Sequence, residues 1–203
     1  WRQGHSEDSI IIDKATHYIR NLRKIYRAYG RQVAFACIVR DPRDELVSLL
    51  ETTKHREIPR DESFWRVWWR CYAGYLEFAA SHRSRYRRNY LIRYEDLVRW
   101  PAHAKAHFLS WLGFTVRPSE LTPAYRILHD DDIQDHKVVR RRVITAESVG
   151  RWQTITDPTT RSLLKSWRTN AEVISLMNRL GYAETGVVDQ KLQLKGIEVF
   201  SPQ

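Results

Sequence analysis

The segment Val33–Val39 constrains the fold more than any other part of the sequence. Its residues, VAFACIV, are all apolar and rich in strand-forming types. An apolar run of this length is expected of a strand buried on both faces of a parallel sheet. Arg40 and the pair Asp41-Pro42 follow directly, and an Asp cap before a first-turn Pro is typical of a helix start. The sequence therefore predicts a strand, a tight turn and a helix in direct succession.

The remaining apolar patterns predict further helices and a second strand. Helices are expected at about residues 13–29 (with Asp13 as its cap), 62–84, 102–112 and 157–180. A short strand is expected at Tyr90–Tyr94, and the basic stretch at about 130–148 has the composition of a loop. Strands that alternate with helices predict an α/β layer architecture with a parallel sheet.

The net charge favours an anionic ligand without choosing among ligand classes. The chain has 34 Lys and Arg against 24 Asp and Glu, a formal charge of +10, which attracts nucleotides, sulfated sugars, nucleic acid and acidic lipid headgroups. One alternative is a nucleic-acid-binding module, but the usual motifs of such modules are absent from the sequence. Its candidate residues would be Arg83, Arg85, Arg87, Arg88 and Arg93. No stretch approaches the roughly 18 apolar residues of a membrane span.

Arg40 and Ser48 are the residues best placed to bind a phosphate. Ligands of open α/β sheets bind beyond the carboxyl ends of the strands, where a helix N-terminus offers unpaired N–H groups. Arg40 can make a bidentate contact with a phosphate dianion, and Ser48, about two turns into the helix, can donate a further hydrogen bond. The alternative is structural: Arg40 pairs with Asp41 or Asp44, and Ser48 lies on a solvated helix face.

Three segments carry a resemblance to a known family. "IVRDPRDELVSLL" resembles the 3′-phosphate-binding motif of sulfotransferases that use 3′-phosphoadenosine 5′-phosphosulfate (PAPS), and Arg40 and Ser48 match its arginine and serine. "LIRYEDLVRWP" (Leu91–Pro101) resembles the second strand and turn of that family, and "SVGRW" (Ser148–Trp152) resembles its late Gly-and-Trp segment. With "DKATHY" (Asp13–Tyr18), which is similar to an Asp-Lys-x-Pro segment, the resemblance covers residues 11 to 182, closest to the bacterial and Golgi-like branch.

The resemblance implies a fold and a reaction. The fold would be α/β, a three-layer, P-loop-NTPase-like sulfotransferase fold with a parallel sheet, incomplete at its N-terminus. Residues 1–185 would form the domain and 186–203 a C-terminal tail. The reaction would transfer a sulfuryl group from PAPS to a hydroxyl or amine by in-line displacement, without a required metal. The partners would be the nucleotide donor and a carbohydrate, lipid or small-molecule acceptor, with no nucleic acid.

The resemblance also implies roles for residues outside the strand–turn–helix unit. Tyr94 is expected at the adenine, with Trp152 as a second candidate that core packing explains better. The family's Arg-Lys-Gly triplet is absent, so Arg141 or Arg151 is expected to take over its 3′-phosphate contacts, unless the run Arg140–Arg142 is solvated. Glu95 and Asp96 are expected to organise the turn after the second strand rather than to catalyse.

Lys14 and His17 are the candidates for catalysis. Spaced i and i+3 in the expected helix, they lie on one side and would serve as charge stabiliser and general base. The alternatives are a salt-bridged lysine and a half-exposed helix histidine. Thr16 stands where the family pattern has Pro, and the family spacing is Lys-x-His rather than Lys-x-x-His.

The sequence contains no Gly/Ser/Thr-rich 5′-phosphosulfate loop and no GxxxxGK[ST]. In the family that loop precedes the Asp-Lys segment, so we expect it upstream of these residues. Two alternatives follow: a non-catalytic sulfotransferase-like domain that binds an anion or a partner, and a P-loop kinase, which would need a Walker lysine. Two cysteines without a disulfide framework favour the cytoplasm, and the Golgi lumen is the alternative if an anchor precedes the chain.

Overall fold

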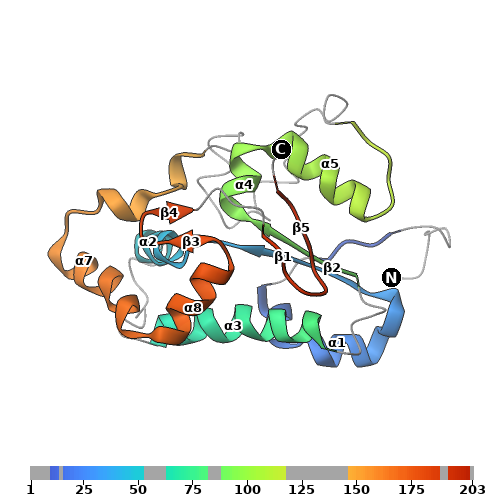
Figure 1. The fold of residues 1–203 in the computed structure, drawn as a ribbon, viewed down its shortest axis with the longest axis horizontal. Coiled ribbons are helices and arrows are strands. Elements are labelled where there is room, and N and C mark those ends of the chain that lie inside the picture. The colour runs from blue at the N-terminus through green and yellow to red at the C-terminus, as the bar shows by residue number, and fades with distance from the viewer. Residues whose placement is uncertain are drawn as a thin grey trace.

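A small parallel sheet forms the centre of the protein in the computed structural model, which describes residues 10–13, 16–52, 63–81, 88–117, 146–187 and 192–201. Its strands are β1 (Ala34–Val39), β2 (Arg88–Arg93) and β5 (Glu198–Val199), in the order β1-β2-β5. β1 and β2 pair in parallel from Ala34 opposite Arg88 to Val39 opposite Arg93. A second, antiparallel pair consists of β3 (Tyr182–Ala183) and β4 (Gly186–Val187). The α/β class with a parallel sheet is confirmed (Figure 1).

Helices make up most of the described structure. They are α1 (Leu22–Tyr29), α2 (Pro42–Thr52), α3 (Ser63–Ala80), α4 (Tyr94–Arg99), α5 (Pro101–Trp111), α7 (Pro158–Lys165) and α8 (Ala171–Arg179). Short 3-10 turns are η1 (Thr16–Arg20), η2 (Gly30–Gln32), η6 (Ala146–Ser148), η7 (Arg151–Thr154) and η8 (Ser166–Thr169). None of the helices in these ranges has the length and apolarity needed to cross a membrane.

The strand, turn and helix from β1 to α2 follow one another as the sequence predicts, but the burial of β1 differs from the prediction. Phe35, Cys37 and Val39 are buried on one face, whereas Ala34, Ala36 and Ile38 are exposed on the other, Ile38 by 54%. The prediction that β1 is buried on both faces is wrong. Among the described residues β1 is an edge strand of the sheet. A small cluster of buried side chains covers Tyr90 and Ile92 on the other face of β2, but it includes no residue of β1.

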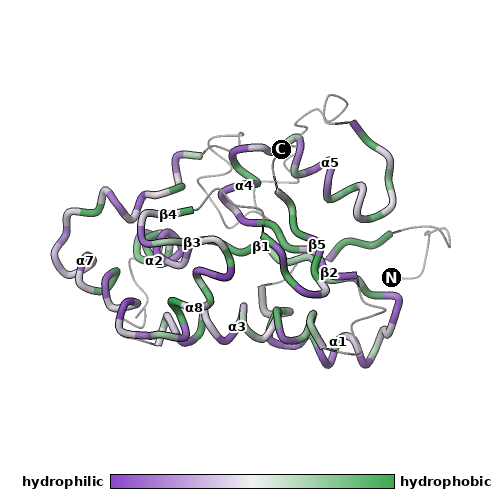
Figure 2. Tube along the Cα trace, viewed as in Figure 1, coloured by the Kyte–Doolittle hydropathy of each residue, from purple (hydrophilic) through white to green (hydrophobic). Residues whose placement is uncertain are grey.

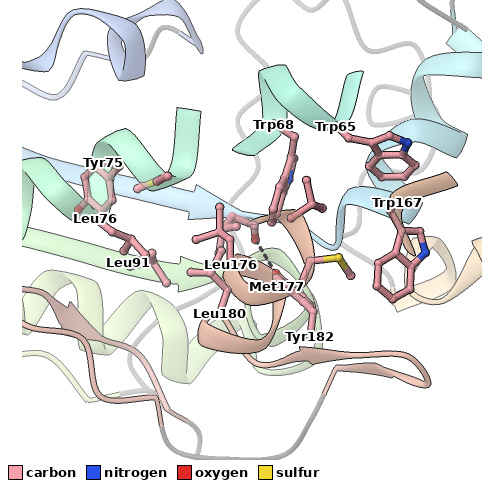
Figure 3. Close-up of a cluster of buried hydrophobic side chains, with 14 of the residues drawn as sticks. Trp65, Trp68, Tyr75, Leu76, Leu91, Trp167, Leu176, Met177, Leu180 and Tyr182 are labelled. Atoms are coloured by element: carbon pink, nitrogen blue, oxygen red, sulfur yellow. Dashed lines mark hydrogen bonds between the residues drawn. The ribbon is translucent and has the colours of Figure 1, made fainter. Parts of the chain in front are cut away.

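The main core lies between α3, α8 and the buried face of the sheet. Figure 3 shows Trp68 of α3 beside Leu176 of α8, and Trp65 of α3 beside Trp167. The Tyr75 hydroxyl donates to the carbonyl of Tyr90 at 2.7 Å, so this buried polar atom is satisfied inside the core. The long helix expected from the apolar pattern of residues 62–84 therefore does cross the core.

The prediction of one continuous closing helix from 157 to 180 is wrong. It is divided into α7, η8 and α8, and Asn170 marks the division. The Asn170 side chain accepts hydrogen bonds from the N–H groups of Glu172 and Val173, both at 3.1 Å, and so begins a new helix. Trp167 in the intervening turn is buried in the main core.

The first helix also begins later than predicted. Asp13 is not its cap, because its carboxylate accepts a hydrogen bond from the Tyr18 hydroxyl and 3-10 turn η1 precedes α1. Gly30 ends α1 with φ of +58°, as the sequence indicates.

Residues 186–199 supply two strands that the sequence pattern did not reveal. β4 pairs with β3, and β5 joins the main sheet with Tyr90 opposite Glu198. The Phe200 N–H donates to the carbonyl of Leu91 at 3.1 Å and extends this pairing.

Candidate functional site

Asp41 closes the turn between β1 and α2 and occupies the start of the helix. Its carboxylate, 1% exposed, accepts the backbone N–H of Arg43 at 2.9 Å and binds the Arg43 guanidinium through Nη2 at 2.6 Å. Asp41 is thus the helix cap that the sequence predicts. The expectation that this helix start offers its N–H groups to a phosphate is wrong for Arg43, because a protein carboxylate is already bound there.

A buried polar network supports this turn from behind. The Arg43 guanidinium, fully buried, also donates to the carbonyls of Ala183 and Glu184 and lies 4.0 Å from the centre of the Trp152 ring. Glu95, also fully buried, accepts the Asp41 N–H at 2.9 Å. These contacts hold the ends of β1 and β2 and the β3 strand in one rigid unit.

Glu95 and Asp96 organise the turn after β2, as the resemblance implies. Glu95 accepts a second hydrogen bond from the Tyr182 hydroxyl at 2.9 Å, and Asp96 binds Nε of Arg93 at 2.6 Å. Burial raises the pKa of Glu95 to about 7 despite the hydrogen bonds from Asp41 and Tyr182. Both carboxylates are used inside the fold.

Arg40 lies at the carboxyl end of β1 and is partly exposed. Its Nη2 donates to the carbonyl of Ser148 at 2.8 Å, and its guanidinium lies 4.6 Å from the centre of the Tyr94 ring. Its Nε is buried and has no hydrogen-bond partner among the described residues. A buried N–H of a cation without an acceptor is costly, so this atom is a natural place for an oxygen of an anionic ligand.

The loop at residues 148–152 is fixed to α2 by Asp44. The Asp44 carboxylate accepts the N–H of Gly150 at 2.6 Å and the N–H of Trp152 at 3.0 Å. Burial raises the pKa of Asp44, and these two backbone hydrogen bonds oppose the rise. Gly150 has φ of +76°, a conformation that L side chains rarely adopt. Asp44 therefore holds the loop beside Arg40.

The described residues do not show Arg40 paired with Asp41 or Asp44, which was the structural alternative to phosphate binding. Asp41 pairs with Arg43, and Asp44 binds the loop backbone, so neither is the hydrogen-bonded partner of Arg40. Ser48 is half-buried in α2, two turns after the strand end. The Tyr94 hydroxyl lies 2.9 Å from Oγ of Ser148, which connects the segment after β2 to the same loop.

Arg151 and Trp152 have partners within the fold. Arg151 donates to Glu51 of α2 through Nη1 at 2.7 Å and also through Nη2. This interaction raises the pKa of Arg151. Trp152 packs against the main core and against Arg43, which agrees with its expected packing role.

The other predicted residues are not tested by this geometry. Lys14 and Arg141, with the run Arg140–Arg142, lie outside the described residues. His17 belongs to η1, but its side chain is not among those described. Their roles remain predictions from the resemblance.

Glu45 is a residue of this region that no sequence pattern indicates. It lies in the first turn of α2, its Oε2 is buried, and that atom has no hydrogen-bond partner among the described residues. Burial raises the pKa of Glu45 to about 7, although Arg40 lowers it. Ser148 and Asp44 lie inside the segments that resemble sulfotransferases. The sequence therefore indicates that they lie near the site, but it does not indicate their contacts.

Comparisons with protein-family models, with curated proteins and with solved structures found no match for this chain. Within the described ranges, no group of three or more His, Cys, Asp and Glu side chains is arranged to hold a metal ion. The arrangement around Arg40 is therefore the strongest guide to function: a cation with one unsatisfied N–H, at the carboxyl end of a parallel strand.

Proposed function

We propose that this chain binds the 3′-phosphate of PAPS through Arg40 and Ser48 and acts in a PAPS-dependent sulfotransferase. One observation carries the proposal. The segments that resemble sulfotransferases lie far apart in the sequence, yet Arg40 contacts both Tyr94 and Ser148. Each segment resembles the family through its own residues, so their convergence on one arginine supports the proposal.

The chemistry of the site fits a dianionic phosphate. The Arg40 guanidinium supplies charge and directional N–H groups, and its orphaned Nε needs an acceptor. The Ser48 hydroxyl would add a hydrogen bond. The finer fold assignment, a three-layer sulfotransferase fold of the P-loop-NTPase kind, belongs to this proposal.

In the proposed reaction the acceptor oxygen or nitrogen attacks sulfur, the sulfur–oxygen bond to the nucleotide phosphate breaks, and the acceptor proton passes to a base. We propose His17 as that base and Lys14 as the cation that stabilises the leaving oxygen. Tyr94 is proposed at the adenine, and Arg141 and Arg151 are proposed near the 3′-phosphate. In this kind of transfer, positioning and electrostatics supply most of the rate.

Calorimetric titration with 3′-phosphoadenosine 5′-phosphate tests the proposal, with 5′-AMP as the ligand control. We expect binding that requires the 3′-phosphate and that weakens by roughly 10- to 100-fold in Arg40→Ala, the loss expected for hydrogen bonds to a charged group. Arg168→Ala is the matched control, because Arg168 is an exposed arginine paired with Glu184.

Equal affinity for both nucleotides would overturn the proposal. If both nucleotides bound equally and this binding still depended on Arg40, the chain would be the non-catalytic anion-binding domain that is the alternative from the sequence.

A further inference from the structure

Five cations lie along the α1 region, and we call them the α1 basic stripe: Arg20, Arg23, Lys24, Arg27 and Arg31. Residues 16–32 contain these five cations and no Asp or Glu. All five are exposed. Arg23 and Arg27 are spaced i and i+4, with Lys24 between them in sequence, so their side chains lie on one side of the helix.

The opposite face of α1 is already occupied by the core. Leu22 is buried, Ile25 packs against the same core cluster, and the Tyr26 ring lies 6.2 Å from that of Phe78 of α3. Figure 2 shows hydrophilic and hydrophobic residues alternating along this segment. Because the apolar face is buried, α1 cannot insert that face into a bilayer as an interfacial helix does.

Four of the five cations of the stripe are not neutralised by the described part of the fold. Arg20, Arg23, Lys24 and Arg27 make no ion pair with any carboxylate that the structure describes. By contrast, Arg43, Arg93 and Arg151 are each paired with an acidic side chain. A row of exposed cations without counter-charges attracts a partner with regularly spaced anions.

The stripe is separate from the Arg40 site. α1 precedes the first residue of β1 and Arg40 follows its last, so the six-residue strand places the two roughly 20 Å apart. Figure 1 shows α1 and α2 at opposite ends of β1. A single small anion cannot contact both regions, but a polymer can.

We infer that the α1 basic stripe binds a linear acidic polysaccharide, which would be the acceptor of the proposed sulfuryl transfer. The choice of a polysaccharide rests on the proposed function, because such a polymer carries both the anionic groups that arginines bind bidentately and the hydroxyls or amines that accept a sulfuryl group. Tyr29, 61% exposed beside the stripe, adds a flat apolar surface.

The test measures binding of a fluorescently labelled heparin dodecasaccharide by anisotropy at several salt concentrations. The variant R23E/R27E should weaken binding at least tenfold and reduce the salt dependence. Its matched control is R161E/K165E on α7, which also changes two exposed cations spaced i and i+4 and lowers the net charge by the same four units. The control should stay within about twofold to threefold of the unchanged protein. The milder R23Q/R27Q, with circular dichroism of all variants, separates lost binding from lost folding.

Three results would overturn the inference. Equal losses in the two charge-reversal variants would show a net-charge effect without a specific surface. Equal or tighter R23/R27-dependent binding of a 12-base-pair DNA duplex would assign the stripe to nucleic acid. Binding to phosphatidylserine vesicles that depends on Arg23 and Arg27 and is tighter than dodecasaccharide binding would assign the stripe to a membrane surface.

Titration of R23E/R27E with 3′-phosphoadenosine 5′-phosphate keeps this inference distinct from the proposed function. The variant should bind the nucleotide like the unchanged protein. Nucleotide binding without dodecasaccharide binding would remove the stripe inference alone. The reverse pattern would remove the proposed donor site, and with it the acceptor role of the polysaccharide, but would leave polysaccharide binding by the stripe.

Discussion

Arg40 donates a hydrogen bond from Nη2 to the main-chain carbonyl of Ser148 at 2.8 Å, across 108 positions of sequence. The contact uses the backbone of Ser148, so the Ser148 side chain is left to interact with Tyr94. The two contacts can therefore be separated by mutation.

The hydroxyls of Tyr94 and Ser148 should be energetically coupled. They lie 2.9 Å apart and are partly buried. In a double-mutant cycle of Tyr94→Phe and Ser148→Ala, measured by urea unfolding, we expect a coupling of about 0.5–1.5 kcal/mol, typical of a neutral hydrogen bond. Strictly additive losses would show that the two hydroxyls do not interact. Ser148→Ala should also retain nucleotide binding better than Arg40→Ala, because the carbonyl remains.

Asp44→Asn should loosen the loop at residues 148–152. The carboxylate accepts two backbone N–H groups, whereas an amide has one oxygen and turns its own NH2 group toward the second donor. We expect the free energy of unfolding to fall by about 1–3 kcal/mol in urea titrations. Asp157→Asn is the control: Asp157 caps α7 through the Thr160 N–H, and Asn caps helices equally well. A loss at Asp157 as large as that at Asp44 would contradict the anchoring role.

Glu45→Gln should stabilise the protein at alkaline pH. Burial raises the pKa of Glu45 in the folded state to about 7, above its ordinary value of 4.5. The folded state therefore holds the proton more tightly, so the contribution of Glu45 to stability is full below pH 4.5 and is lost as pH rises to about 7. The slope is at most roughly 1.4 kcal/mol per pH unit.

Glutamine imitates the protonated carboxyl and does not titrate. The difference in unfolding free energy between Glu45→Gln and the unchanged protein should thus grow in favour of the variant between pH 4.5 and about pH 7, to roughly 1–3 kcal/mol, and stay level above that. Glu77→Gln, at an exposed position of α3, serves as the control and should show no such trend. A flat difference for Glu45→Gln would refute the buried-carboxyl interpretation.

Removal of the Arg43 side chain should be severely destabilising. Arg43→Met leaves the buried Asp41 carboxylate without its cation and the carbonyls of Ala183 and Glu184 without donors. We expect a loss of about 3–5 kcal/mol, measured by chemical denaturation. Arg168→Ala, at an exposed ion pair, should cost no more than about 1 kcal/mol. Similar costs at the two positions would mean that burial does not govern the energetics of Arg43.

The sequence predicts local structure well where one short signal decides it. The apolar run before Arg40 and the Asp41-Pro42 pair specify β1 and the start of α2, and Gly30 specifies the end of α1. The apolar spacing continues through Asn170 and so predicts no break there. Only the contact between its side chain and the following backbone reveals the new cap.

The parts that depend on distant residues were not predictable. β1 looks like a central strand in sequence, and its exposed face reflects which elements cover the sheet. β5 has only two residues, so periodicity cannot detect it. For the site, the resemblance singles out Arg40 and Ser48, but no sequence pattern predicts an Nε without a partner on Arg40 or a buried carboxyl at Glu45.

The contact between Phe200 and Leu91 has a consequence for synthesis of the protein. Tyr90, Ile92 and Trp111 form an apolar surface that Phe200 helps to cover, and β5 pairs with β2 only after about a hundred intervening residues have been made. Until then, a nascent chain carries this surface and an open strand edge into a crowded cell. A fragment that ended before Glu198 would lack both β5 and Phe200 and keep this surface and the strand edge exposed, and would be a substrate for chaperones and proteases.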